Sequence, residues 1–224
     1  DGTIRIDPYV RDNAVYHASY FARDYAGGRH AWACGAHEGP GLALDEIGQT
    51  RSGTVRTGDT RRVYRLAVAA TAEYTALQGG ATQAMNAIVS LVNQLNGVYE
   101  VEASIRFVLV ANNDQIIYTD ALTDPYTNSD NDAMLGENQG AIDGVIASSN
   151  YDIGHVFGTA NGGVASIGVV CVPGFKARGV SASPFAITDP YTIQTFCHEV
   201  GHQFNARHTF NGINGSCTGA QRSS

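Results

Sequence analysis

The sequence has little of several features that mark common protein classes. Only one of its 14 basic residues is a lysine, and 21 acidic residues give a formal net charge of -7. This balance argues for solubility and against nucleic acid as the main partner. No apolar run approaches the roughly 18 residues that a membrane-spanning helix needs, so we expect no membrane span.

Internal repeats, a phosphate-binding loop and a Ser/His/Asp arrangement are also missing from the 224 residues. The 43% apolar content suffices for a sizeable core and argues against disorder throughout. The chain starts at Asp1 rather than methionine and shows no signal peptide, so we interpret it as a processed or trimmed product.

Cysteines are few, and none has the paired C-x-x-C spacing of a structural zinc cluster: Cys34, Cys171, Cys197 and Cys217. Four cysteines allow three connectivities, which sequence cannot separate. We expect one disulfide within the last three, with Cys34 free, which would fit an oxidising compartment. The predicted location is secreted or extracellular, with the periplasm as an alternative.

What is present is a regular alternation of strand and helix patterns after residue 60. Apolar runs predict strands at 63–70, 105–111, 153–157, 164–171 and near 178–182, and helical spacing predicts helices at about 80–97 and 137–148. Gly97 suits the end of the first helix. A last helix is predicted to begin with Asp189 as its N-cap and Pro190 at its first position. This order favours an α/β sandwich with a mostly parallel sheet.

The last helix carries the most informative motif, in which His198 and Glu199 are followed by His202 and later by His208. Residues four apart share a helix face, so His198 and His202 can reach one metal ion. Three protein ligands plus an open position are typical of catalytic zinc, which predicts a zinc hydrolase and a peptidase in particular. The alternative is that both histidines lie on the surface of a structural helix.

A third ligand at His208 requires the chain to reverse soon after His202. Asn205 lies where the helix must stop. Asparagine tolerates the left-handed conformation best after glycine, so Asn205 can end the helix and let His208 approach the metal.

The pattern H-E-x-x-H-x-x-N-x-x-H resembles the metzincin signature, in which glycine usually stands at the position of Asn205. The segments 64–74, 105–114, 151–157 and 208–212 look like those of bacterial reprolysin-like (adamalysin-related) metallopeptidases. The resemblance covers about residues 61–217. It implies a metzincin-like (zincin) sandwich with a twisted, mostly parallel sheet, one antiparallel edge strand and an active-site helix.

The resemblance also implies roles for particular residues. His198, His202 and His208 are expected to bind Zn2+, and Glu199 is expected to act as the general base on a zinc-bound water. The strand around 164–170 is expected to be the antiparallel edge that receives an extended polypeptide substrate as an added strand. A plain edge strand is the alternative.

Two departures from the metzincin pattern stand out. Asn205 replaces the usual glycine, and the only methionines, Met85 and Met134, precede the histidines. The methionine-containing turn that the family places after the third histidine is thus not in this sequence. We therefore expect residues 61–224 to form the upper subdomain of a catalytic domain without that turn, and leave open whether this length is active by itself.

Residues 1–60 differ from the rest, with weak periodicity and a polar, arginine-containing stretch at 51–62. That stretch is predicted to be an exposed linker, either a solvated loop or a maturation site. Metzincin zymogens commonly use a cysteine followed by glycine as a fourth zinc ligand, and Cys34 precedes Gly35. We hypothesise that residues 1–60 are a pro-segment remnant and linker with Cys34 as the zymogen switch; a buried or disulfide-bonded cysteine is the alternative.

Two weaker signals concern calcium and a further histidine. Asn128-x-Asp130-x-Asp132 resembles the start of a calcium loop, but the required glycine and closing glutamate are missing. A solvated turn is therefore favoured, with Ca2+ as the lesser alternative. His155 is predicted to be a core histidine rather than a ligand, and His37 has no helpful spacing.

These observations favour a secreted zinc endopeptidase captured with part of its pro-segment. Retention of Glu199 argues against the alternative, a non-catalytic binding or adhesion module that keeps a metallopeptidase fold. The position of His208 argues against a zinc peptidase of another clan. Oligomeric state and cleavage-site preference are left open.

Overall fold

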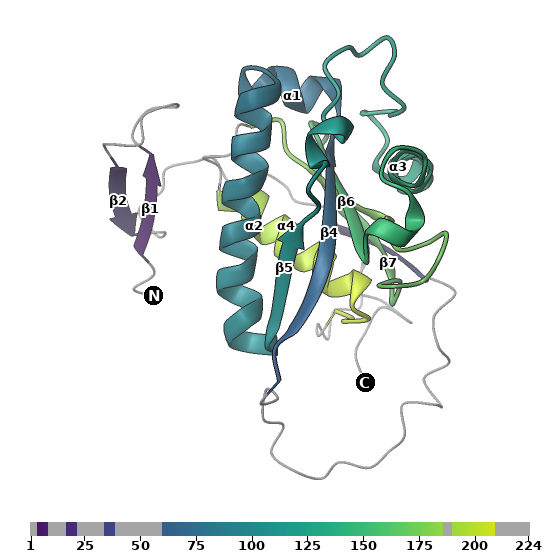
Figure 1. Ribbon diagram of the computed structural model, residues 1–224. Helices are drawn as coiled ribbons and strands as arrows, with labels where there is room; N and C mark the ends of the chain where they lie inside the picture. Colours follow the sequence, from purple (N-terminus) through teal and green to yellow (C-terminus); the bar gives the residue numbers. More distant parts are fainter. Residues whose placement is uncertain (1–3, 9–16, 22–33, 39–59, 186–189, 209–224) are drawn as a thin grey trace, which may run out of the picture.

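The structure is a computed structural model that describes residues 4–8, 17–21, 34–38, 60–185 and 190–208 (Figure 1). In chain order its elements are β1 (Ile4–Pro8), β2 (His17–Phe21), β3 (Cys34–Glu38), β4 (Arg62–Ala70), α1 (Ala72–Gln78), α2 (Ala81–Ala103), β5 (Ile105–Leu109), the 3-10 helix η3 (Asn113–Ile116), α3 (Asn131–Val145), the 3-10 helix η4 (Ser148–Asn150), β6 (Ile153–Gly158), β7 (Gly162–Ile167), β8 (Gly179–Ala182) and α4 (Pro190–Gln203).

A six-stranded sheet in the order β3-β7-β8-β6-β4-β5 forms the centre of the fold. Its neighbours are parallel except for β7 and β8, which pair antiparallel. Strands β1 and β2 form a separate antiparallel pair. This arrangement confirms the predicted α/β fold with a mostly parallel sheet and one antiparallel strand.

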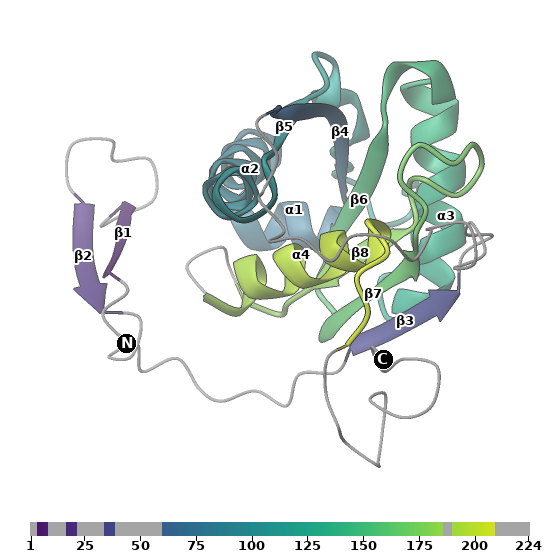
Figure 2. The same ribbon diagram turned by 90° about the horizontal axis from the view of Figure 1, so that it is seen from below.

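Helices cover both faces of the sheet, with α2 and α4 on one side and α3 on the other (Figures 1 and 2). Two apolar clusters fill the two layers. The first includes Ile88 of α2 and Phe196 of α4, and the second includes Met134 and Ile142 of α3. Strand β4 explains the division, since residues 66–70 are fully buried and contribute to both clusters in alternation.

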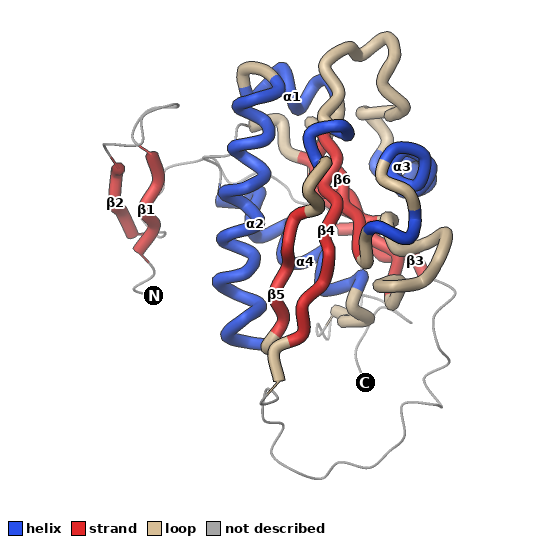
Figure 3. Tube along the Cα trace, in the orientation of Figure 1, coloured by secondary structure: helices blue, strands red, loops and turns tan. Residues whose placement is uncertain are grey.

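Several predicted boundaries were wrong for local reasons. Helix α2 continues past Gly97 to Ala103, because Gly97 lies on the exposed side and the last turn is packed by Tyr99, whose hydroxyl donates to the Cys197 carbonyl at 2.8 Å. Helix α3 begins at Asn131 rather than near 137, because the Asp130 side chain accepts hydrogen bonds from the first-turn amides. Helix α1 was not predicted (Figure 3).

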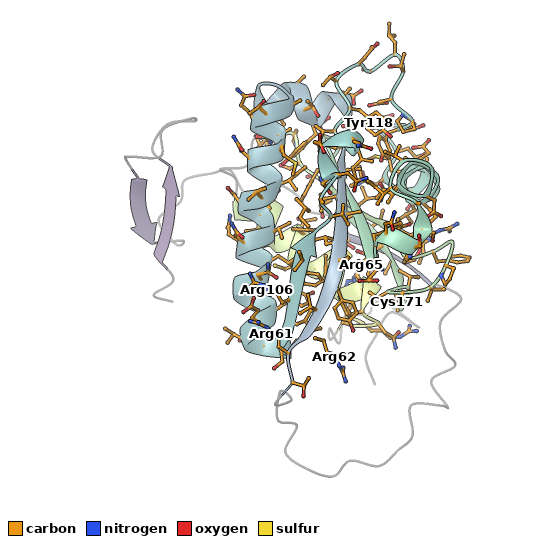
Figure 4. All side chains as sticks on the ribbon, viewed as in Figure 1. Arg61, Arg62, Arg65, Arg106, Tyr118 and Cys171 are labelled. Atoms are coloured by element: carbon orange, nitrogen blue, oxygen red, sulfur yellow. The ribbon has the colours of Figure 1, made fainter. Side chains whose placement is uncertain are left out.

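The sheet edges depart most from the prediction. Strand β3 was not predicted, yet it pairs with β7 from Cys34 opposite Gly163 to Glu38 opposite Ile167. Strand β7 is therefore second from the edge in the full chain, and it ends at Ile167 rather than 171, before Gly168 with φ 67°. At the far edge, Arg61 and Arg106 both make ion pairs with Glu100 of α2 (Figure 4).

No helix within the described residues is both long and apolar enough to cross a membrane.

Candidate metal centre

Helix α4 presents two histidines beside strand β7. Its apolar residues Phe196 and Val200 are fully buried against the sheet. His198 and His202 lie one turn apart, and their ring centroids are 4.6 Å apart with perpendicular planes. The helix period thus brings the two rings together as the spacing predicts.

The chain reverses directly after α4. Asn205 has φ 73°, the left-handed conformation expected there, and its amide donates to the His202 carbonyl at 2.8 Å. The segment after β7 supports this end of the helix, since the amides of Gly168 and Val169 donate to the carbonyls of His202 and Gln203. The reversal brings His208 Nε2 to 3.0 Å from His198 Nε2 and 3.1 Å from His202 Nε2.

Cys34 is the fourth member of this cluster, although 164 residues separate it from His198. Its Sγ lies 3.2 Å from Nε2 of His198, 3.4 Å from Nε2 of His202 and 3.3 Å from Nε2 of His208. Cys34 is buried, and its sulfur lies among the three histidines. It forms no disulfide with another described cysteine.

The four atoms have the spacing of ligands around one small ion. Tetrahedral zinc, with bonds of about 2.0–2.1 Å to nitrogen and 2.3 Å to sulfur, would separate nitrogens by roughly 3.3 Å and nitrogen from sulfur by roughly 3.6 Å. The atoms here all lie within 4.8 Å of one another, and the three side chains other than His198 are buried. Three imidazoles and a thiol are also donors that zinc prefers, so the residues fit this metal.

The protonation of the histidines favours ligation. Nδ1 of His202 lies 2.7 Å from the Ala206 carbonyl, which fixes the proton on Nδ1 and leaves the Nε2 lone pair for a metal. Burial lowers the pKa of His198 to about 4, with further lowering from His202 and His208. Burial also lowers the pKa of His202. Neutral imidazole is the form that binds metals.

Glu199 lies beside the cluster and is fully buried. Burial raises the pKa of its carboxyl well above the ordinary value, and the nearby Cys34 thiol opposes this shift. The carboxylate fits only because Gly163 has no side chain: a Cβ there would lie 2.6 Å from Oε1 of Glu199. Gly163 was not singled out from sequence, although two glycines within a strand often mark a close approach.

The oxygen-rich stretch between η3 and α3 uses its side chains within the protein. Asp124 accepts from the Ala72 and Tyr126 amides, Asn128 accepts from the Thr159 amide, and Asp130 caps α3. These contacts describe a hydrogen-bonded turn. Asp132 contacts His37 of β3 at 2.8 Å, a pairing that sequence spacing did not predict.

The remaining predicted features divide into three groups. Cys171 (Figure 4) and Cys197 are not bonded to one another, which excludes one of the expected disulfides within the last three cysteines. Cys217 lies outside the described residues, so a disulfide with Cys217 stays a prediction. His155 is fully buried with hydrogen bonds to Gln203 and Ser181, which confirms the core histidine. Residues 39–59, which hold most of the predicted linker, lie outside the described part of the chain.

Comparison with known families gives one match. Residues 60–224 match the model of a family described as metallo-peptidase family M12B, reprolysin-like. A search of curated proteins found no match.

Proposed function

The chain belongs to the reprolysin-like M12B metallopeptidases and is a metalloendopeptidase by that membership, and we propose that it is a zinc enzyme in a latent form. The convergence of Cys34 Sγ on three histidine Nε2 atoms is the observation that carries this proposal. In the proposed latent enzyme, His198, His202 and His208 are permanent ligands of the metal. Cys34 is the fourth ligand until it is displaced.

Bound zinc supplies Lewis acidity, which polarises the scissile carbonyl and acidifies a water molecule. The protein's own contribution is the position of Glu199. Its buried carboxylate lies beside the place that Cys34 vacates, where it takes a proton from water and passes it to the leaving amine. Burial suits both the uptake and the release of the proton, because it moves the pKa of the carboxyl toward neutral pH.

The substrate of the proposed enzyme is a polypeptide in extended conformation, which adds as a strand along the outer side of β7 (Gly162–Ile167), here called the β7 edge. In the full chain β3 holds this edge by parallel pairing. Residues 34–38 therefore deny a substrate both the edge and the fourth ligand position. This supports the hypothesis that residues 1–60 act as a pro-segment before a catalytic domain at 61–224.

The general-base proposal is tested by Glu199→Ala in the full chain that also carries Cys34→Ala. We expect zinc content to stay the same while cleavage of an unstructured protein falls by at least about 100-fold, since positioned acid–base groups contribute about 10²–10⁴. Metal analysis and a casein-type cleavage assay measure the two quantities. The matched control is Glu102→Ala at an exposed position of α2. Undiminished cleavage by the Glu199 variant would reject the assignment.

The latency proposal is tested by Cys34→Ala alone. We expect cleavage activity to rise by at least about tenfold, because the thiolate no longer competes for the fourth position. Cys171→Ala, which alters an exposed free thiol, is the control and should leave activity unchanged. If both variants match the unmodified chain, Cys34 does not impose latency.

Secretion, and calcium as a further ion, stay predictions from the sequence; the proposal requires neither.

A further inference from the structure

Strand β3 lies on the β7 edge in the place that an added peptide strand would take. Side chains alternate along such a strand, so its residues point in turn toward α4 and toward α3. Cys34 points toward α4, where it meets the histidines. Positions 35 and 37 face α3. A Cβ built on Gly35 would lie 3.0 Å from Val164 Cγ2 and 3.9 Å from Asp132 Oδ1. His37 Nε2 lies 2.8 Å from the same Asp132 oxygen.

Asp132 is well placed to meet side chains of any strand on this edge. It lies in the first turn of α3, with its side chain 70% exposed. The backbone amides of Asp132 and Ala133 are held by the Asp130 cap, which fixes the turn that carries the carboxylate. Because alternation has a period of two in either direction, a substrate strand of either polarity would also direct every second side chain toward α3.

We infer that Asp132 is a specificity-determining residue that favours substrates with a lysine or arginine near the cleaved bond. His37 stands where that basic side chain would lie. It is three residues from Cys34, whose sulfur lies at the metal position, and strands rise by about 3.3 Å per residue, so the basic residue belongs about three residues from the cleaved bond. This inference rests on the proposed function, since it needs a substrate on the β7 edge.

The competing explanation is that the contact between His37 and Asp132 only helps to hold β3 in place. An exposed pair of this kind contributes little to stability, so both explanations allow a modest energy. They differ in what happens to peptides: a subsite discriminates between substrates, whereas a contact that only holds β3 changes how fully the edge is blocked and affects all substrates alike.

The experiment uses the full chain with Cys34→Ala, with and without Asp132→Asn. One peptide series carries Arg, Gln or Glu at each position from two to four residues on either side of a single cleavage site, and mass spectrometry identifies the products. At one position we expect kcat/KM to be about three- to tenfold higher for Arg than for Glu, a range typical of an exposed charge contact with added like-charge repulsion.

In the Asp132→Asn chain the ratio of Arg to Glu peptides should fall to near one, while the Gln peptide is cleaved as before. Glu102→Gln removes a charge from the exposed part of α2 and should leave the ratio unchanged. A ratio that survives Asp132→Asn, or an equal loss for all three peptides, would overturn the inference. If no peptide is cleaved by the Cys34→Ala chain, the proposed function itself fails, and the inference falls with it.

Discussion

His155 shows how one buried residue connects the sheet to the metal-binding helix. Its Nε2 lies 2.9 Å from Ser181 Oγ on β8, and its Nδ1 lies 3.2 Å from Oε1 of Gln203, the residue after His202. Gln203 in turn donates to the Gly154 carbonyl of β6 at 2.9 Å. This network fixes the end of α4 on the sheet, from which the turn to His208 departs.

Burial lowers the pKa of His155 to about 4, which makes stability depend on pH. Between about pH 6.5 and pH 4 the unfolded chain binds a proton that the folded chain does not, so the free energy of unfolding rises with pH across this window. The free energy of unfolding is lower by about 3 kcal/mol at the acid end of this window, near pH 4, than at pH 7. We expect His155→Gln to flatten this dependence.

Urea unfolding at pH 7, 6 and 5 measures the effect, in a chelator so that metal binding does not contribute. Val101→Ala, at an exposed position without a titratable group, is the control and should keep the slope of the unmodified chain. Parallel pH profiles for all three chains would contradict the role assigned to His155.

At the scale of elements, β7 shows how a strand makes room for the proposed general base. Gly163 lets Glu199 and Thr195 of α4 approach the sheet, since a Cβ there would lie 2.7 Å from Glu199 Cγ and 2.8 Å from Thr195 Cγ2. We expect Gly163→Ala to displace Glu199 and to lower kcat by about 10- to 100-fold in the Cys34→Ala chain, because misplaced catalytic groups lose roughly that much.

Zinc content should persist in the Gly163→Ala chain, because none of the three histidines meets the added methyl group among the nearest atoms. Gly97→Ala is the matched control: its Cβ would enter open space on α2, and replacing a helical glycine stabilises by about 0.5–1 kcal/mol. Steady-state kinetics and metal analysis separate the two effects. Full activity in the Gly163 variant would show that Glu199 needs no such space.

The elements also show which features the sequence could predict. Strands β4, β5, β6 and β8 and helix α4 were expected, because continuous apolar runs and helical spacing are local patterns. The three histidines were expected as a set for the same reason, because their spacing is local. His198 and His202 lie in one helix, and His208 follows the turn that Asn205 allows. Local pattern also explains the misplaced end of α2, where an exposed Gly97 was interpreted as a stop.

What the sequence could not predict depends on contacts between distant segments. Strand β3 has only five residues and no apolar alternation, and its pairing partner β7 lies more than a hundred residues away. The space at Gly163 exists only when α4 packs on β7. The meeting of His37 and Asp132 likewise requires β3 on the sheet and α3 above it. Such features follow from tertiary packing, which no local spacing encodes.

For the whole molecule, the proposed metal would join β3, the first strand of the six-stranded sheet in sequence, to the last described segment of the chain. Cys34 and His208 are 174 residues apart, and their ligand atoms lie 3.3 Å from one another. One ion on both would therefore couple β3 to α4 and to the turn after it. Anything that binds only the folded chain stabilises it, by about 4 kcal/mol when free metal exceeds its Kd 1,000-fold.

We expect a chelator to lower the melting temperature and to speed amide exchange both at 34–38 and at 198–208, with recovery when zinc returns. The Cys34→Ala chain distinguishes the two segments. There the chelator should still speed exchange at 198–208, where three ligands remain, but should leave 34–38 unchanged, because that strand no longer contacts the metal. Hydrogen exchange with mass spectrometry measures both segments in one experiment. If 34–38 exchanges at the same rate with and without chelator in the unmodified chain, β3 is held by its pairing with β7 alone, and latency does not pass through the metal.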